Sequence, residues 1–70
     1  MNAREWIATY AGQMDVEPPT EEEFAAILEL AGHAAHASER MAAPVACWLA
    51  ARTGRSARDS LIVARSVVET

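Results

Sequence analysis

The same helix-start pattern occurs at three places in the chain: a short polar residue followed three positions later by a carboxylate. The pairs are Asn2 with Glu5, Thr20 with Glu23, and Ser56 with Asp59. The first side chain of each pair can accept a hydrogen bond from an unpaired N–H of the first helical turn. Pro44 predicts a fourth start, because its fixed φ and missing N–H suit the first helical position. These starts predict a protein built from helices.

Two signals mark where these helices end. Glu17 precedes Pro18 and Pro19, which pushes it out of helical geometry, and Gly54 stands where a left-handed cap is wanted. The chain shows no strand alternation and no internal repeat. We therefore predict an all-α fold, a single domain over residues 1–70. It is a bundle of four short helices at about 2–14, 20–37, 44–53 and 56–69.

Helical periodicity predicts which side of each helix packs inward. Residues 44–53 are apolar nearly all round, so we expect this helix to be the most buried and Trp48→Ala to unfold the domain. The expected inward faces of the first two helices are Ala3, Trp6, Ile7, Tyr10 and Met14, then Phe24, Ile27, Leu28, Ala31, Ala34 and Ala35.

The last helix has a wide apolar arc of Ala57, Leu61, Val63, Ala64, Val67 and Val68. Ile62 projects from its opposite, polar side. Exposed branched residues near a chain end often mark a docking surface, so Ile62, Val63 and Val67 are the interface candidates. The alternative is that this helix simply packs deep in the bundle.

The chain is so short that a binding partner is expected to contribute to its stability. A 70-residue chain buries only about 60% of the surface that its unfolded form exposes. Cys47 is the single cysteine, which excludes an internal disulfide, and no Cys and His spacing matches a structural zinc framework. A protein partner or a second copy remains as support.

Hydropathy indicates the cellular location of the protein, and charge indicates which classes of ligand it can bind. No apolar run has secretory or membrane-spanning length, so we expect a cytoplasmic protein that binds no membrane. The net charge of −4 disfavours general binding to nucleic acid, because like charges repel the phosphate backbone. The last third is nevertheless basic, with Arg52, Arg55, Arg58 and Arg65 against Asp59.

The stretch HAAHASERMAAP, residues 33–44, has three interpretations. It can be a structural corner, in which His36 and Arg40 complement the end of one helix and Glu39 the start of the next. It can be a metal site, with Glu29, His33 and His36 as ligands and Cys47 as a fourth. It can be an anion site, in which His36, Arg40 and the amides after Ala43 hold a phosphate or carboxylate. From the helical wheel we expect His33 to be solvated and His36 half-buried, on the same flank as the small residues Ala25 and Gly32.

LAGHAAHASERMAAPVACWLA, residues 30–50, resembles the centre of an uncharacterised family of small helical domains common in actinobacteria. Ala35, His36, Arg40, Ala43 and Pro44 match its motif. Some members of that family look like extensions fused behind a molybdenum cofactor guanylyltransferase. The resemblance implies an accessory role there, not the transferase chemistry, and it supplies no catalytic residues. The chain has no glycine-rich nucleotide loop.

Three function classes remain to compare. An enzyme is disfavoured, because no nucleophile has a base within evident reach, and we expect no cofactor. A helix-turn-helix module over residues 48–67 is the alternative, although Arg55 follows the turn glycine and Ser60 takes a position that usually needs an aliphatic residue. A non-catalytic interaction or assembly domain, which includes a homodimer, fits the visible features best.

Overall fold

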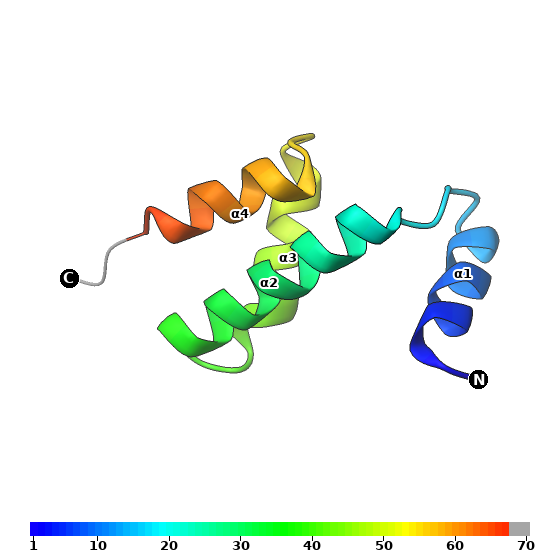
Figure 1. Ribbon diagram of the computed structural model, residues 1–70, viewed down its shortest axis with the longest axis horizontal. Coiled ribbons are helices and arrows are strands. Elements are labelled where there is room, and N and C mark those ends of the chain that lie inside the picture. The colour runs from blue at the N-terminus through cyan, green and yellow to red at the C-terminus, as the bar shows by residue number, and fades with distance from the viewer. Residues whose placement is uncertain (68–70) are drawn as a thin grey trace.

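The computed structural model describes residues 1–67, and within them the chain is helical apart from its ends and the segments that connect the helices. The helices are α1 (Ala3–Gln13), α2 (Glu21–Ala37), α3 (Ala42–Arg52) and α4 (Ala57–Arg65) (Figure 1). The predicted all-α fold with four short helices is confirmed. The last helix ends at Arg65, earlier than predicted. Val68, which was predicted on its apolar arc, lies outside the described residues.

All three predicted N-caps form as expected. Asn2 Oδ1 accepts from the Glu5 amide at 2.8 Å, and Ser56 Oγ accepts from the Asp59 amide at 3.0 Å. Thr20 makes the complete capping box, because its Oγ1 accepts from the Glu23 amide at 3.1 Å and its own amide donates to Glu23 Oε1 at 2.8 Å. These bonds satisfy amides that a helix start otherwise leaves unpaired.

Helix α3 begins at Ala42 and not at Pro44, and no side chain caps it. Pro44 therefore occupies the third helical position. Its missing N–H costs nothing there, because the amides of the first turn have no partner within the helix. The proline signal located the right turn of the helix but not its first residue.

The end of α1 is a Schellman motif built without glycine. Asp15 has a left-handed φ of 59°. The Val16 amide donates to the Ala11 carbonyl at 3.0 Å, and the Asp15 amide donates to the Gly12 carbonyl at 3.2 Å. This motif places Val16 beside Ala11, the one buried residue of α1. At the end of α3, Gly54 has a φ of 77°, as its left-handed cap role predicts.

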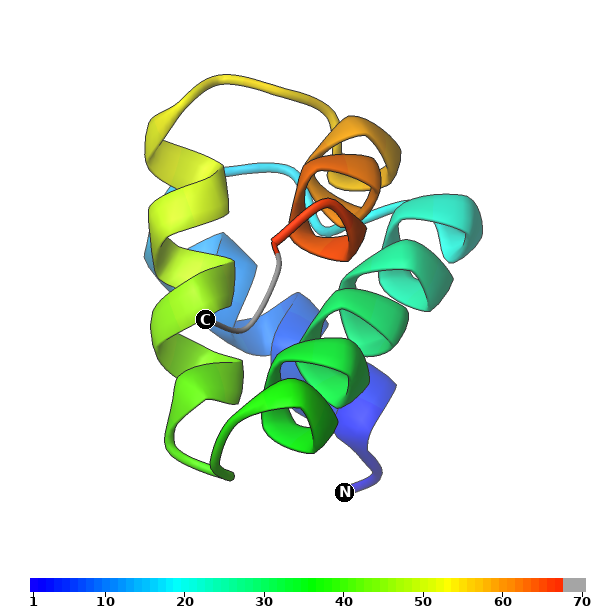
Figure 2. The same ribbon diagram turned by 90° about the vertical axis from the view of Figure 1, so that its left-hand side faces the viewer.

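Helix α2 is the centre of the bundle, because α3 and α4 both pack against it (Figure 2). Its Leu30 is 3% exposed, and Leu61 of α4 is 4% exposed. Together with Ala26 and the buried Ser60, these residues form the small interior of the three-helix body. Helix α1 stands beyond the N-terminal end of α2, and within residues 1–67 no helix packs along it (Figure 1).

The prediction that the third helix is the most buried is not confirmed. Helix α3 contains no buried residue, and Trp48 is 62% exposed. The reason is that α2 and α4 reach only one side of α3, where its small residues Ala46, Cys47 and Ala50 lie half-buried. Trp48 points to the opposite side, which no helix in the described part of the chain covers.

The expected inward faces of α1 and α2 are also partly wrong. Leu28 is exposed, whereas Ala26 and Leu30, which were not predicted on the inward face, are buried. The inward side of α2 is shifted around the helix because α4 occupies one flank and α3 the next. On α1, more than half of the Trp6 and Met14 side chains and nearly half of Tyr10 are exposed, and Ile7 is half-buried.

Candidate protein-interaction surface

The histidine corner is closed by backbone hydrogen bonds. The Ala42 amide donates to the Glu39 carbonyl at 2.9 Å, and the Ala43 amide donates to the Arg40 carbonyl at 3.1 Å. The Glu39 side chain does not cap α3, contrary to the expectation from the sequence. Its backbone carbonyl does the capping instead, which leaves the carboxylate free of that role.

The two histidines have exchanged the environments expected of them. His33 is half-buried, and His36 is exposed. Helix α4 packs against the side of α2 that carries His33 and so covers part of this side chain. A Cβ added to Gly32, on the His36 side, would meet nothing within 4 Å, so no helix within residues 1–67 uses the close approach that Gly32 permits.

His33 lines an open groove of about 690 Å³ between the end of α2, the start of α3 and the end of α4. Most of the lining is alanine, because these short side chains leave space where the helices diverge. The lining residues are His33, Ala34, Ala37, Ser38, Glu39, Ala42, Ala46, Ala64 and Val67.

The candidate metal ligands are not brought together. Glu29 Oε2 instead accepts a hydrogen bond from Arg65 Nη2 at 3.1 Å, which ties α2 to α4. Cys47 donates to the Ile27 carbonyl at 4.0 Å, and burial raises the pKa of its thiol. No cluster of three His, Cys, Asp or Glu residues suited to a metal ion occurs within residues 1–67.

The candidate anion ligands His36 and Arg40 are both exposed. The two amides before Pro44 are already bonded to the carbonyls of residues 39 and 40, and proline itself has none. The start of α3 therefore offers an anion few free donors, so the geometry favours the structural interpretation of this corner.

Two of the three interface candidates, Ile62 and Val63, lie at the surface of α4, and Val67 follows its C-cap. Ile62 is 57% exposed, and half or more of the Val63 and Val67 side chains is also exposed. The buried residues of the same helix, Ser60 and Leu61, lie on its inward side. Val67 borders the groove, and helical spacing places Arg58 and Arg65 around Ile62. Ile62 therefore has a basic rim, and Val63 and Val67 continue the exposed apolar surface around the outside of the helix.

Sequence reasoning missed two further exposed apolar surfaces, formed by residues that it placed in the interior. On α3 these are Val45, Trp48 and Leu49, and on α1 and at its C-cap they are Trp6, Tyr10 and Met14. The Arg52 guanidinium lies 4.8 Å from the Trp48 ring centre. The available signal was chain length, since four helices of 9 to 17 residues have too few neighbours to cover apolar arcs this wide.

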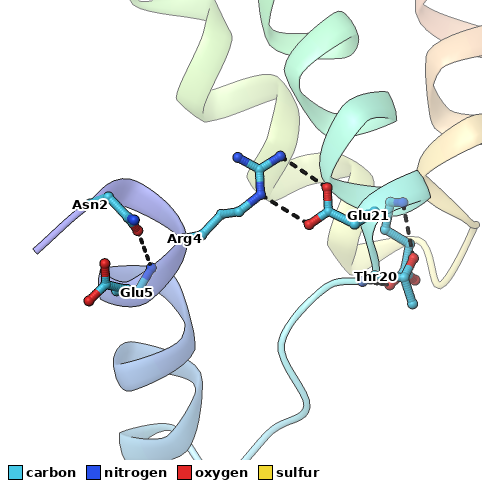
Figure 3. Close-up of polar contacts among 6 residues, drawn as sticks. Asn2, Arg4, Glu5, Thr20 and Glu21 are labelled. Atoms are coloured by element: carbon cyan, nitrogen blue, oxygen red, sulfur yellow. Dashed lines mark hydrogen bonds and ion pairs between the residues drawn. The ribbon is translucent and has the colours of Figure 1, made fainter.

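A surface ion pair anchors α1 to the body (Figure 3). Arg4 Nε donates to Glu21 Oε1 at 3.0 Å, and Arg4 Nη2 donates to Glu21 Oε2 at 3.1 Å. This hydrogen-bonded pairing, with the charge of Arg4 added to it, lowers the pKa of Glu21. The same guanidinium lies 4.5 Å from the centre of the Phe24 ring.

The connection between α3 and α4 is a compact turn over residues 53–56. Thr53 Oγ1 donates to the Ala50 carbonyl at 2.8 Å and accepts from the Arg55 amide at 3.2 Å. Ser60 is buried in the following helix, at the position where the helix-turn-helix pattern prefers an aliphatic side chain.

None of the helices in the described part of the chain is both long enough and apolar enough to cross a lipid bilayer. No curated protein and no solved structure matches the chain. One family model does match, over residues 1–69, and its description is a domain of unknown function, DUF6457. Because the match spans nearly the whole chain, the protein belongs to the DUF6457 family.

Proposed function

We propose that the chain is a non-catalytic, cytoplasmic interaction domain whose α4 patch, Ile62, Val63 and Val67, binds a partner protein. The observation that carries this proposal is the exposure of three branched side chains on and directly after a helix whose inward side is already packed. Exposed apolar groups rimmed by polar residues are a common feature of protein interaction sites.

The chemistry of the patch describes its partner. Arg58 and Arg65 flank Ile62 at helical spacing, although Arg65 also bonds Glu29. The complementary surface is an apolar hollow with carboxylates at its edge, because opposite charges at a rim favour encounter of the right partner. The resemblance of residues 30–50 to actinobacterial domains fused to molybdenum cofactor guanylyltransferase makes that enzyme the partner to test first.

The experiment measures binding of the full chain to the guanylyltransferase of the same organism by calorimetry. Ile62→Asp replaces the apolar side chain between Arg58 and Arg65 with a charge, and we expect it to weaken binding at least about tenfold, or 1.4 kcal/mol. Leu28→Asp is the matched control, because Leu28 is 59% exposed, close to the 57% of Ile62, and lies on α2 outside the patch. Equal binding by both variants, or no binding by the natural chain, would contradict the proposal.

A second candidate is binding to duplex DNA through α3, the turn and α4. The left-handed Gly54 in a turn of four residues is the observation that favours it. Arg55 and Arg58 are both exposed and would contact phosphates. Binding that weakens with added salt and is lost in the Arg55→Ala, Arg58→Ala double variant would support this candidate.

A further inference from the structure

Helix α1 lacks the packing that a helix of its length needs. It has 11 residues, and isolated helices shorter than about 12 to 15 residues are marginal in water. Its links to the body are the exposed ion pair with Glu21 and the contact of Arg4 with Phe24. Exposed ion pairs contribute little to stability. A lasting α1 therefore requires something to cover its apolar side.

The uncovered side of α1 faces away from its own body. Trp6 and Tyr10 stack with their ring centres 5.1 Å apart. At about 100° per residue, they lie more than a third of a turn from Arg4, whose bonds to Glu21 mark the side toward α2. Rotating α1 to bury the two rings in its own chain would break the bonds between Arg4 and Glu21.

A matching surface lies on the outer side of α3. Val45, Trp48 and Leu49 are each more than half exposed. They lie away from Cys47, which contacts the Ile27 carbonyl of α2. Glu5 on α1 and Arg52 beside Trp48 add opposite charges at the edges of the two surfaces.

The exposed apolar area on α1 and α3 is large enough for an interface between two copies. A compact monomer of 7.6 kDa exposes about 4,300 Å², whereas this chain exposes 5723 Å². The six side chains of the α1 and α3 surfaces still present roughly 100 Å² each. Their total, with a polar rim, approaches the ~800 Å² per partner of an ordinary stable interface.

We propose that two copies of the chain form a symmetric dimer by exchanging α1, whose Trp6 and Tyr10 pack on Val45, Trp48 and Leu49 of the second copy. A two-fold arrangement buries both surfaces of both copies at once, because α1 of each copy packs on α3 of the other. A partner of another kind would have to match two separate surfaces, whereas a second copy matches both by carrying them. The α4 patch is not used.

The test is the mass of the full chain by sedimentation over a wide concentration range. We expect it to rise from 7.6 kDa toward twice that value. Trp6→Ala and Trp48→Ala should each raise the dissociation constant at least tenfold. Leu28→Ala, at a similarly exposed position outside both surfaces, should not change it. A chain that stays monomeric at the highest concentration overturns the dimer, and calorimetry with the guanylyltransferase then still tests the α4 patch separately.

Mixing the two tryptophan variants tests the exchange itself. A mixed pair keeps one intact contact, between α1 of the Trp48→Ala copy and α3 of the Trp6→Ala copy. We therefore expect the mixture to associate more tightly than either variant alone. Pairing of α1 with α1 would leave Trp48→Ala unaffected, pairing of α3 with α3 would leave Trp6→Ala unaffected, and either result overturns the exchange. Thermal melts of each variant check that the three-helix body remains folded.

Discussion

Leu30 should matter more to the stability of the monomer than Trp48, although tryptophan is much the larger residue. Leu30 is 3% exposed, between α3 and α4, and Leu→Ala at buried sites costs about 2 to 5 kcal/mol. Neighbouring alanines and an adjoining pocket leave room for relaxation, so we expect about 3 kcal/mol for Leu30→Ala.

For Trp48 the cost scales with the part of the side chain that is buried, which is just over a third. Full burial of tryptophan is worth about 3 to 5 kcal/mol, and alanine is the better helix former by a few tenths of a kcal/mol. Trp48→Ala should therefore cost about 1 kcal/mol. This corrects the expectation from the sequence that the same substitution unfolds the domain.

The assay is thermal and urea unfolding followed by circular dichroism, at a concentration low enough to keep the chain monomeric. A domain of this size loses about 4 to 8 °C of Tm per kcal/mol. Leu30→Ala should lower Tm by roughly 12 to 24 °C and Trp48→Ala by roughly 4 to 8 °C. Equal losses, or a larger loss for Trp48→Ala, would show that α3 is covered in the monomer and would refute the arrangement of the helices.

Three further predictions concern backbone geometry, capping and the thiol. Gly54→Ala should destabilise by about 1 to 2 kcal/mol through left-handed strain alone, because its added Cβ meets nothing within 4 Å. Gly32→Ala, equally unobstructed but inside a helix, should stabilise by about 0.5 to 1 kcal/mol, and urea melts that show the same sign for both would contradict this. Thr20→Ala removes the capping box and should cost about 1 kcal/mol in the same melts, whereas an unchanged midpoint would mean that the box contributes nothing. Burial raises the pKa of the Cys47 thiol, so the unfolded chain loses its proton first and stability should fall as pH rises above about 8.5. Iodoacetamide should label folded Cys47 more slowly than the urea-unfolded chain, and equal rates would refute a shielded thiol.

The helix starts were predictable because each is a local event. A capping bond joins residues three positions apart. Asn2, Thr20 and Ser56 therefore predict the starts of their helices independently of the tertiary structure. The left-handed Gly54 is local in the same way. The end of α1 was predicted to within one residue. Its left-handed position was not predicted, because Asp15 and not glycine takes it, and aspartate has many other uses in a sequence.

The candidate site was predicted only in part. Ile62 was correctly expected on the outward side of the last helix, since its neighbours along that helix fix its direction. The roles of His33 and His36 were exchanged, and Trp48 was expected inside. Each of these errors depends on which flank of a helix its neighbours occupy, a choice that periodicity cannot make when the apolar arc is wide.

The sequence by itself therefore determined that the chain is helical, where three of the helices begin and how the turn after α3 is made, because these depend on bonds between near neighbours. Only the tertiary structure decided that α2 and not α3 is central, that Leu30 and not Trp48 is buried, and that α1 stands apart. Burial is a relation between segments distant in the chain. With four short helices and many alanines, several packings satisfy the same apolar pattern, and the one adopted determines which apolar residues remain on the surface.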